Sequence, residues 1–293
     1  MSGGGAPDAA GSEPESPLAP LSAVIARHGL RPRRALGQHF LLDPGLCGRI
    51  ARAARPDAAS AILEVGPGPG GLTRALLAAG AARIVAVEKD RRCVAALQEL
   101  AARFPGRLEI VEGDALAFDV ASVAPARIGI VANLPYNIGT RLLLRWLDRA
   151  ERIDSMTLMF QKEVAVRLTA TGGRDYGGLS VRAQWLCDCE RLFDVSPGSF
   201  QPPPAVTSTV VRLVPRAEPL APAEPDALDD VTRAAFGQRR KMLRSALRRL
   251  TRDPHALLEG AGIAPEARAE TLSVADFCAL ARTWAAMRRA EEP

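Results

Sequence analysis

The chain has 293 residues, 47% of them hydrophobic, so it is long enough for one large or two modest domains with a substantial core. Its formal charge of +5 favours an acidic partner such as nucleic acid, and no apolar run approaches the ~20 residues that a membrane span needs. The five cysteines are scattered and odd in number, which is typical of reduced thiols in the cytosol. Cys187-x-Cys189 has no second ligand pair, so we expect a cytoplasmic protein without a metal site.

The first segment, "MSGGGAPDAAGSEPESPLAP", is rich in glycine, alanine, proline and serine. It has neither the basic start nor the hydrophobic stretch of a secretory signal. Such a composition cannot bury enough apolar surface to fold. We therefore predict a disordered tail over residues 1–22.

Short β-rich runs alternate with helical patterns from about residue 45 to 195, as in "LTRALLAAG" and "RRCVAALQELAARF". Strands separated by helices imply crossover connections and a mostly parallel sheet covered on both faces. "TSTVVRLV" (207–214) leaves a proline-rich loop and is expected to form the antiparallel edge. The parallel strands are expected at 61–65, 83–88, 108–111, 128–132 and 156–160.

The composition changes to that of a linker in "PRAEPLAPAEPDA" (215–227), and only helical patterns follow. We therefore predict an α/β domain over residues 23–215 and a small all-helical domain over residues 216–293. Residues 233–252 contain eight basic residues and no acidic one, with leucines on one side of a predicted continuous amphipathic helix. Its other side would follow phosphates, or would simply be a solvated basic face.

A glycine-rich turn follows the first predicted strand in "LEVGPGPGGLTRALL". Gly66, Gly68 and Gly71 satisfy the G-x-G-x-x-G spacing of dinucleotide-binding loops, and Glu88 ends the next strand, where an acid can hold a ribose diol. The two prolines of this loop, however, lack the backbone N–H groups that would bind a pyrophosphate. The loop therefore favours a nucleoside ligand without phosphate.

S-adenosylmethionine is such a ligand, because it carries an adenosine, an amino-acid tail and a positive sulfonium. Glu64, one position inside the strand, would repel a phosphate but suits a cation. Asp114 follows the third strand, where it can hydrogen-bond an adenine edge. Each acid alone would be typical of a solvated strand end, but ligands bind at the carboxyl ends of such sheets. We therefore expect the glycine loop, Glu88 and Asp114 to form one cofactor site.

The fourth strand ends in "IVANLPYNIG", where polar and cyclic residues follow an apolar run. The side-chain oxygen of Asn133 and a backbone carbonyl at Leu134 or Pro135 can accept hydrogen bonds from an exocyclic amine. Tyr136 can stack on a base swung out of its own stack. Such a site would act by positioning and electrostatics, without a strong base. An isolated N-L-P-Y is also typical of a turn that ends a strand.

These motifs together resemble the ribosomal RNA adenine-N6 dimethyltransferase family, and in particular its bacterial KsgA-type, small-subunit branch. The resemblance extends over nearly all of residues 30–285 and implies a Rossmann-like class I methyltransferase sheet with a helical C-terminal domain. The matching segments outside the loops already described are "RRALGQHFLLD" (33–43), "FQKEVAVRL" (160–168), "SPGSFQPPPAVTSTVVRL" (196–213) and "AFGQRRKMLRSAL" (235–247).

The resemblance implies roles for single residues. Phe200 would pack on the target adenine opposite Tyr136, and His39 stands where the family more often has asparagine. The residues expected to bind S-adenosylmethionine are His39, Leu41, Gly66, Glu88, Asp114 and Asn133. The residues expected at the reacting base are Asn133, Leu134, Pro135, Tyr136 and Phe200. The residues expected to contact RNA are Arg239, Arg240, Lys241, Arg244 and Arg248.

The function that follows from the resemblance is dimethylation of two adjacent adenosines in the 3′-terminal hairpin of 16S (small-subunit) ribosomal RNA. The enzyme would act as a monomer on an immature 30S particle, with S-adenosylmethionine as methyl donor. Three alternatives remain: a large-subunit enzyme of the antibiotic-resistance type, a catalytically silent ribosome-assembly factor, and a nicotinamide-dependent dehydrogenase. The loop prolines and the absence of a plausible catalytic pair disfavour the dehydrogenase.

Overall fold

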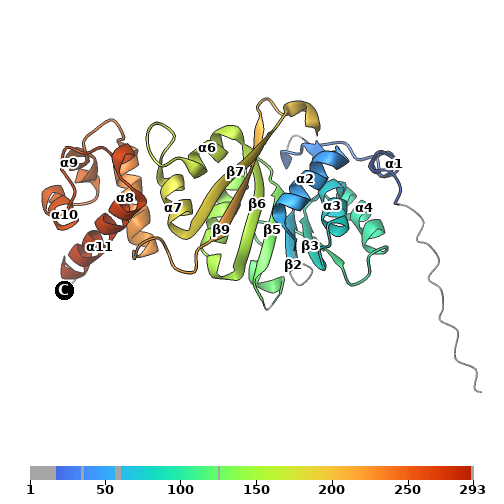
Figure 1. The fold of residues 1–293 in the computed structure, drawn as a ribbon, viewed down its shortest axis with the longest axis horizontal. Coiled ribbons are helices and arrows are strands. Elements are labelled where there is room, and N and C mark those ends of the chain that lie inside the picture. Colours follow the sequence, from blue (N-terminus) through green and yellow to red (C-terminus); the bar gives the residue numbers. More distant parts are fainter. Residues whose placement is uncertain (1–17, 34–35, 57–60, 125, 292–293) are drawn as a thin grey trace, which may run out of the picture.

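The structure is a computed structural model that describes residues 18–33, 36–56, 61–124 and 126–291. Figure 1 shows a central sheet flanked by helices, with the C-terminal helices gathered at one end of the molecule and α1 (Leu21–Arg27) at the other. Residues 1–17 of the predicted tail lie outside the described residues. Its last two residues belong to α1, so ordered structure begins before residue 23.

The sheet has seven strands, and the first five in spatial order are parallel. The predicted α/β class with a mostly parallel sheet is therefore confirmed. The strand order reverses direction between β2 and β5, and ligands bind at such a switch point in open α/β sheets. In spatial order the strands are β4 (Leu108–Glu112), β3 (Arg83–Glu88), β2 (Ala61–Val65), β5 (Ile128–Asn133), β6 (Ile153–Gln161), β9 (Ser208–Pro215) and β7 (Cys187–Val195).

The predicted position of the antiparallel edge strand is wrong. β9 is antiparallel, but it lies between β6 and β7 and pairs with both. β7 forms the edge instead, and it was not predicted because four of its nine residues are charged and exposed, so they interrupt the apolar pattern of a strand. Charged residues are typical of edge strands, where they oppose further strand pairing.

Helices cover both faces of the sheet, because alternate residues of the central strands point to opposite sides. In β2, Ile62 packs with α2 and α3, whereas Leu63 packs with α5 and α6. Both faces are thus apolar and buried, as in other parallel sheets. The helices on the first face are α2 (Pro44–Ala54), α3 (Gly71–Ala78) and α4 (Arg91–Ala101), and those on the second are α5 (Gly139–Leu147), α6 (Lys162–Thr169) and α7 (Gly178–Leu186).

A second apolar core lies in the C-terminal region and includes side chains of α7, among them Trp185. The predicted linker is held in place, because Trp185 Nε1 donates to the Ala221 carbonyl and Arg282 donates to the Pro222 carbonyl. The helices of this region are α8 (Pro225–Gly237), α9 (Leu243–Ala246), α10 (Pro254–Gly260) and α11 (Val274–Glu291). Short 3-10 turns lie at Val120–Ser122, Ala150–Arg152, Pro197–Ser199, Leu247–Arg249 and Ala269–Thr271.

The predicted continuous basic helix over residues 233–252 is also wrong. α8 ends at Gly237, and the chain turns before α9 begins at Leu243. The backbone N–H of Leu243 donates to the Ala267 carbonyl and that of Arg244 to the Pro265 carbonyl. Because these amides bond to a distant segment, the helix cannot continue through them. The predicted leucine side is nevertheless buried at Leu243 and Leu247.

The N-terminal segment adds a two-stranded sheet in which β1 (Phe40–Leu41) pairs antiparallel with β8 (Phe200–Gln201). This pairing brings residues 36–41 and the proline-rich loop to the same rim as the strand ends. No helix in the described part of the chain is long and apolar enough to cross a membrane.

Candidate functional site

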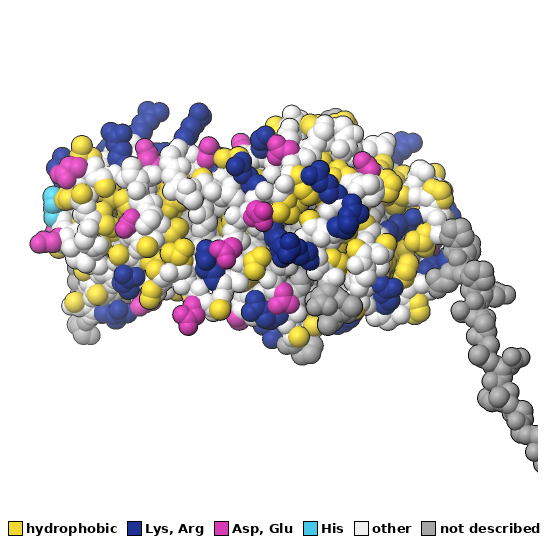
Figure 2. Space-filling view, in the orientation of Figure 1, with side chains coloured by type: hydrophobic (Ala, Val, Ile, Leu, Met, Phe, Trp, Pro, Cys, Tyr) yellow, Lys and Arg dark blue, Asp and Glu magenta, His cyan; other side chains and the backbone are white. Residues whose placement is uncertain are grey.

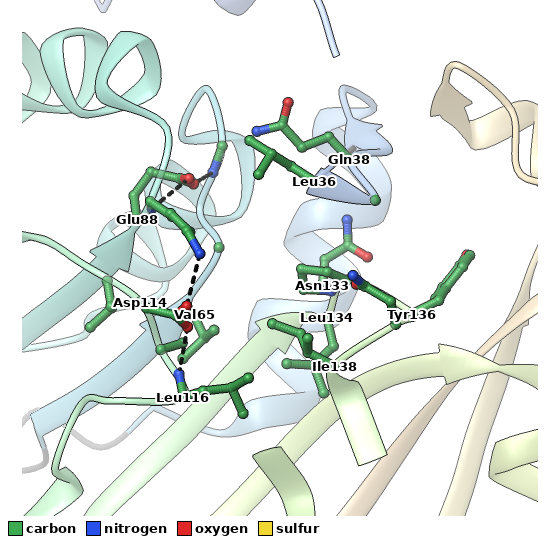
Figure 3. A pocket seen from close by; sticks show the side chains of 18 of the residues that line it. Leu36, Gln38, Val65, Glu88, Asp114, Leu116, Asn133, Leu134, Tyr136 and Ile138 are labelled. Atoms are coloured by element: carbon green, nitrogen blue, oxygen red, sulfur yellow. Dashed lines mark hydrogen bonds and ion pairs between the residues drawn. The ribbon is translucent and has the colours of Figure 1, made fainter. Parts of the chain in front are cut away.

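A pocket of about 180 Å³ opens where β2, β3, β4 and β5 end, at the switch point of the sheet. Figure 3 shows Glu88 and Asp114 on one side of it and Asn133, Leu134 and Tyr136 on the opposite side, with Leu36 and Gln38 at the rim. The strand ends that the sequence analysis grouped therefore meet in one cavity, which we call the main pocket.

The glycine loop after β2 has no backbone donor left for a phosphate between residues 66 and 70. The N–H of Gly66 donates to the Val87 carbonyl, that of Gly68 to Glu88, and that of Gly70 to the Pro67 carbonyl, while the other two residues are prolines. Gly66 and Gly68 adopt φ values of 67° and 55°, in the region that glycine occupies without strain. The turn itself thus offers a pyrophosphate no backbone donor, which favours a nucleoside ligand.

Glu88 closes this loop onto the next strand. Its carboxylate accepts three backbone hydrogen bonds, from Gly68 at 3.0 Å and from Lys89 and Asp90 at 2.8 Å each. Burial raises the pKa of Glu88, and the three N–H donors oppose that rise. A carboxylate has about four acceptor positions, so an acceptor remains for a ligand hydroxyl.

Asp114 lies at the other end of the same wall, after β4. One of its carboxylate oxygens accepts from the Leu116 N–H at 2.9 Å, and the other pairs with Lys89 Nζ at 2.8 Å. The Lys89 ammonium, with the Leu116 amide, holds the pKa of Asp114 below its usual range. Lys89 lines the pocket and was not predicted, because a lysine in a charged strand end carries no distinctive sequence signal.

The side chain of Asn133 is oriented by a hydrogen bond from its Nδ2 to the His39 carbonyl, at 3.0 Å. This bond leaves the amide oxygen without a partner among the described residues. The Pro135 carbonyl accepts from the N–H groups of Ile138 and Gly139, whereas the Leu134 carbonyl accepts no such bond from any residue that the structure describes. Of the two backbone acceptors that the sequence suggested, Leu134 is thus the one that remains available.

Tyr136 is half-buried beside this pair. Its hydroxyl and Ser208 Oγ lie 2.6 Å apart, and its ring stacks with the His39 imidazole at 5.6 Å between centroids. The imidazole Nδ1 in turn lies 2.7 Å from the Pro202 carbonyl. His39 therefore connects the N-terminal segment, the tyrosine and the proline-rich loop.

Phe200 and Leu41 are both buried and face each other across the β1–β8 pair. Phe200 belongs to the apolar core beside α2 and α3 and does not line the main pocket. Its predicted contact with a base stays a prediction. Leu41 lines a second, smaller cavity of about 30 Å³, which we call the side cavity.

The side cavity also reaches Glu64 on β2, together with Gly66 and Asn133. Glu64 is 1% exposed and neither of its carboxylate oxygens has a hydrogen-bond partner. Burial raises the pKa of Glu64 to about 8, the nearby Thr73 hydroxyl opposes the rise, and the Glu88 carboxylate adds to it.

The predicted RNA contacts divide into two groups. Arg239 donates to the carbonyls of Gly173 and Tyr176 and lies 3.7 Å from Glu270, so it already holds the helical region to the loop before α7. Arg244 pairs loosely with Glu266 at 3.4 Å. Three of the predicted residues are exposed and have no ion pair with any described residue: Arg240, Lys241 and Arg248.

A further set of arginines was missed. Arg141 and Arg145 on α5 and Arg149 just past its end recur every four residues, and all three are exposed without a described ion pair. α5 begins three residues after Tyr136, and the charge of Arg141 acts on Asp114 across the pocket rim. The four-residue spacing was visible in the sequence, but it is also typical of any solvated helix face.

On the face drawn in Figure 2, Lys and Arg side chains alternate with Asp and Glu side chains, so charge on this side forms no extended patch of one sign. Within the described residues, no group of three or more His, Cys, Asp or Glu side chains is placed to hold a metal ion.

Comparison with known proteins decides the family. A sequence model described as ribosomal RNA adenine dimethylase matches residues 29–286. The chain belongs to this family. The predicted membership and the expected enzyme class are therefore confirmed.

Curated relatives of this dimethylase are similar over nearly their full length. Two proteins named ribosomal RNA small subunit methyltransferase A, from Rhodospirillum rubrum and Methylobacterium radiotolerans, are 56% and 58% identical. Each match covers 94% of this chain and 96% of the relative.

Solved structures of two related methyltransferases have the same fold as this dimethylase. A dimethyladenosine transferase from Plasmodium falciparum is 28% identical with a TM-score of 0.73, over 83% of this chain and 96% of that one. The 23S rRNA methyltransferase ErmE is also 28% identical, with a TM-score of 0.65, over 84% of this chain and 99% of that one. These neighbours confirm the predicted methyltransferase fold.

The buried Glu64 predicts a pH-dependent stability. Its folded-state pKa of about 8 lies above the ordinary value of 4.5, so the folded state holds a proton that the unfolded state has lost. Wild-type stability should therefore fall as pH rises from about 4.5 to 8, relative to Glu64→Gln. Without ligand, thermal unfolding should show equal midpoints near pH 4.5 and a Gln variant more stable by several degrees at pH 8. A difference that does not change with pH would contradict this assignment.

Proposed function

We propose that this protein transfers methyl groups from S-adenosylmethionine to N6 of two adjacent adenosines in the 3′-terminal hairpin of small-subunit ribosomal RNA. The observation that carries the proposal is the pair of unpartnered acceptors at Asn133 Oδ1 and the Leu134 carbonyl, beside a pocket built for a nucleoside. Because its substrate is ribosomal RNA in an immature 30S particle, we place its action in the cytoplasm.

The main pocket fits the adenosine of the methyl donor. Glu88 would accept a hydrogen bond from a ribose hydroxyl at its remaining acceptor position, and Asp114, whose two bonds leave acceptor positions open, would accept one from the adenine amine. The fully bonded glycine loop supports a donor without phosphate. Once bound, S-adenosylmethionine supplies an electrophilic methyl group on a sulfonium.

The acceptor side works by orienting a poor nucleophile. The lone pair of an adenine N6 is delocalised into the ring, and an acceptor on each N–H favours a pyramidal nitrogen with the lone pair directed toward the methyl group. Asn133 Oδ1 and the Leu134 carbonyl would be these two acceptors, while Tyr136 would support the face of the base. The nitrogen becomes positively charged on methylation, so water can take up its proton and no strong base is needed.

The choice of the small-subunit substrate rests on the relatives. The curated proteins at 53–58% identity are named for the small subunit, whereas ErmE, named for 23S rRNA, is 28% identical. The intact acceptor pair disfavours a silent assembly factor. The acceptor pair also disfavours a nicotinamide-dependent dehydrogenase, because hydride transfer does not need it.

We propose that RNA phosphates contact two sets of unpaired cations. One set is Arg240, Lys241 and Arg248 in the helical region, with Arg244 at their side. The other is Arg141, Arg145 and Arg149, whose neighbours on α5 lie about 6 Å apart along the helix axis, comparable to the spacing of successive phosphates. Leu144, exposed between two of them, could pack against a ribose or a base.

The substrate is tested by transfer of labelled methyl groups to immature small subunits, immature large subunits and the naked RNA of each. We expect label in small-subunit RNA of the immature particle, at up to four methyl groups per RNA. Label confined to large-subunit RNA would overturn the substrate, and RNA binding without any transfer would favour the assembly factor.

The acceptor pair is tested by Asn133→Ala. We expect methyl transfer to fall by about a hundredfold to a thousandfold, because the variant loses an acceptor at the reacting nitrogen, whereas RNA affinity should stay within a few fold. Asn137→Ala is the matched control, since Asn137 is an exposed amide that lines the same pocket but supplies neither proposed acceptor, and it should retain transfer within a few fold. An active Asn133→Ala enzyme would exclude the mechanism.

The two RNA-contact sets are tested by salt-dependent binding. Substituting Arg141 and Arg145 by alanine, or Arg240 and Lys241 by alanine, should weaken binding and reduce the salt slope by about 1 for each lost phosphate contact. Arg288→Ala together with Arg289→Ala is the control, because these arginines pair with Asp230 and Glu224. Equal losses in the control would show that only total charge matters.

A further inference from the structure

The acceptor side of the main pocket carries a ring that the proposed reaction does not use. Among the described residues, three aromatic or imidazole side chains line this pocket: His39, Phe40 and Tyr136. Phe40 is buried and lies against Gly68 of the glycine loop, on the cofactor side. His39 and Tyr136 are only partly buried, so part of their ring surface remains available to a ligand.

The rings of His39 and Tyr136 form one stacked pair, with 5.6 Å between the centroids and 28° between the planes. Each ring is also held by a polar contact. The Tyr136 hydroxyl lies 2.6 Å from Ser208 Oγ, and His39 Nδ1 donates to the Pro202 carbonyl at 2.7 Å, since a carbonyl can only accept. Because both rings are fixed in the free protein, a base that stacks on them pays little for ordering them.

This ring pair lies next to the acceptor for the reacting amine. The Asn133 amide donates to the His39 carbonyl at 3.0 Å, and Tyr136 follows Asn133 by three residues. Figure 3 shows Tyr136 beyond Asn133, on the side away from Glu88. A purine whose amine donates to Asn133 Oδ1 therefore has its ring system beside the pair.

Phe200, the residue that the family resemblance suggests for a second stacking face, is not placed for this role. It is 4% exposed, packs in the core beside α2 and α3, and does not line the main pocket. The ring that does line the pocket and contacts Tyr136 is His39. Any base has a π-face that can stack on such a ring.

We propose that the target adenine stacks on the His39–Tyr136 pair, so that His39 is a second base-stacking residue of this enzyme. This inference rests on the proposed RNA substrate. His39 would act by binding the base and would exchange no proton with it. Asparagine, the more frequent residue of the family at this position, has no ring to offer, so the stacking face is a property of this chain.

The experiment uses the full chain with S-adenosylhomocysteine and immature small subunits whose RNA carries 2-aminopurine in place of one target adenosine. This base emits strongly when it is unstacked and weakly when it stacks on a ring. We expect weak emission in the wild-type complex and emission several-fold stronger with His39→Ala. His28→Ala is the matched control and should behave as wild type, because His28 is also a partly buried histidine with a side-chain bond, to Glu99, and lines neither cavity.

Two further variants separate the ring of His39 from its hydrogen bond. His39→Phe keeps a ring and loses the bond to Pro202, whereas His39→Asn keeps a polar group and loses the ring. We expect weak emission with phenylalanine and strong emission with asparagine. For methyl transfer to unmodified particles, kcat/KM should fall by about fivefold to a hundredfold with alanine or asparagine and stay within a few fold of wild type with phenylalanine.

Three results would overturn the proposal. Weaker emission and a higher kcat/KM with His39→Ala would mean that the His39 ring occupies the place of the base. Stronger emission with Phe200→Leu, and none with His39→Ala, would assign the stacking to Phe200. A loss of S-adenosylhomocysteine affinity with His39→Ala, at unchanged emission, would assign the ring to the cofactor.

The failure of this inference differs from failure of the proposed function. If wild type transfers no methyl group to RNA, the proposed function itself is wrong. If wild type methylates small-subunit RNA, and His39→Ala changes neither the emission nor kcat/KM, only the role of His39 is excluded.

Discussion

The parallel pairing of β2 with both β3 and β5 is the constraint on which the site depends. In this register Val65 lies beside Val87, and Glu64 lies beside Val131, so the three strands end at the same rim. The residues that follow them then converge without long loops. Glu88 reinforces the arrangement, because it accepts the Gly68 N–H and so fixes the glycine loop to the neighbouring strand. The same bond removes a donor that a phosphate would need.

Residues that directly follow an apolar strand could be placed from the sequence. Features that depend on contacts between distant segments of the chain could not. Glu88, Asp114 and Asn133 could be placed because each follows an apolar strand whose position the alternation of strands and helices makes plain. The edge strand β7 was missed because four exposed charged residues interrupt its apolar pattern, and the break after Gly237 depends on bonds to residues 265–267. The structural contacts of Arg239 and the burial of Phe200 likewise arise from segments far away in the chain.

The donor and acceptor halves of the site are connected through His39. Its carbonyl orients the Asn133 amide, its ring stacks on Tyr136, and its Nδ1 lies against the Pro202 carbonyl. A change in the proline-rich loop therefore reaches the Asn133 amide, which we propose contacts both ligands. Histidine can replace the asparagine expected at position 39, because the contact to Asn133 comes from the backbone carbonyl of this residue. The imidazole ring adds a surface that stacks on Tyr136.

A single buried arginine links the two sets of proposed RNA contacts. Arg182 on α7 is 8% exposed; it pairs with Asp148 at the end of α5 at 2.7 Å and approaches Asp229 on α8 at 3.9 Å. A buried cation of this kind cannot lose its partners cheaply, so it resists separation of the two helices. Because α7 also contributes to the C-terminal core, the helical region does not move freely as a separate unit. The arginines on α5 and those near α9 are then held at a fixed separation. We propose that such a rigid pair of phosphate contacts, with the proposed base pocket beside one of them, would select RNA by shape as well as by charge.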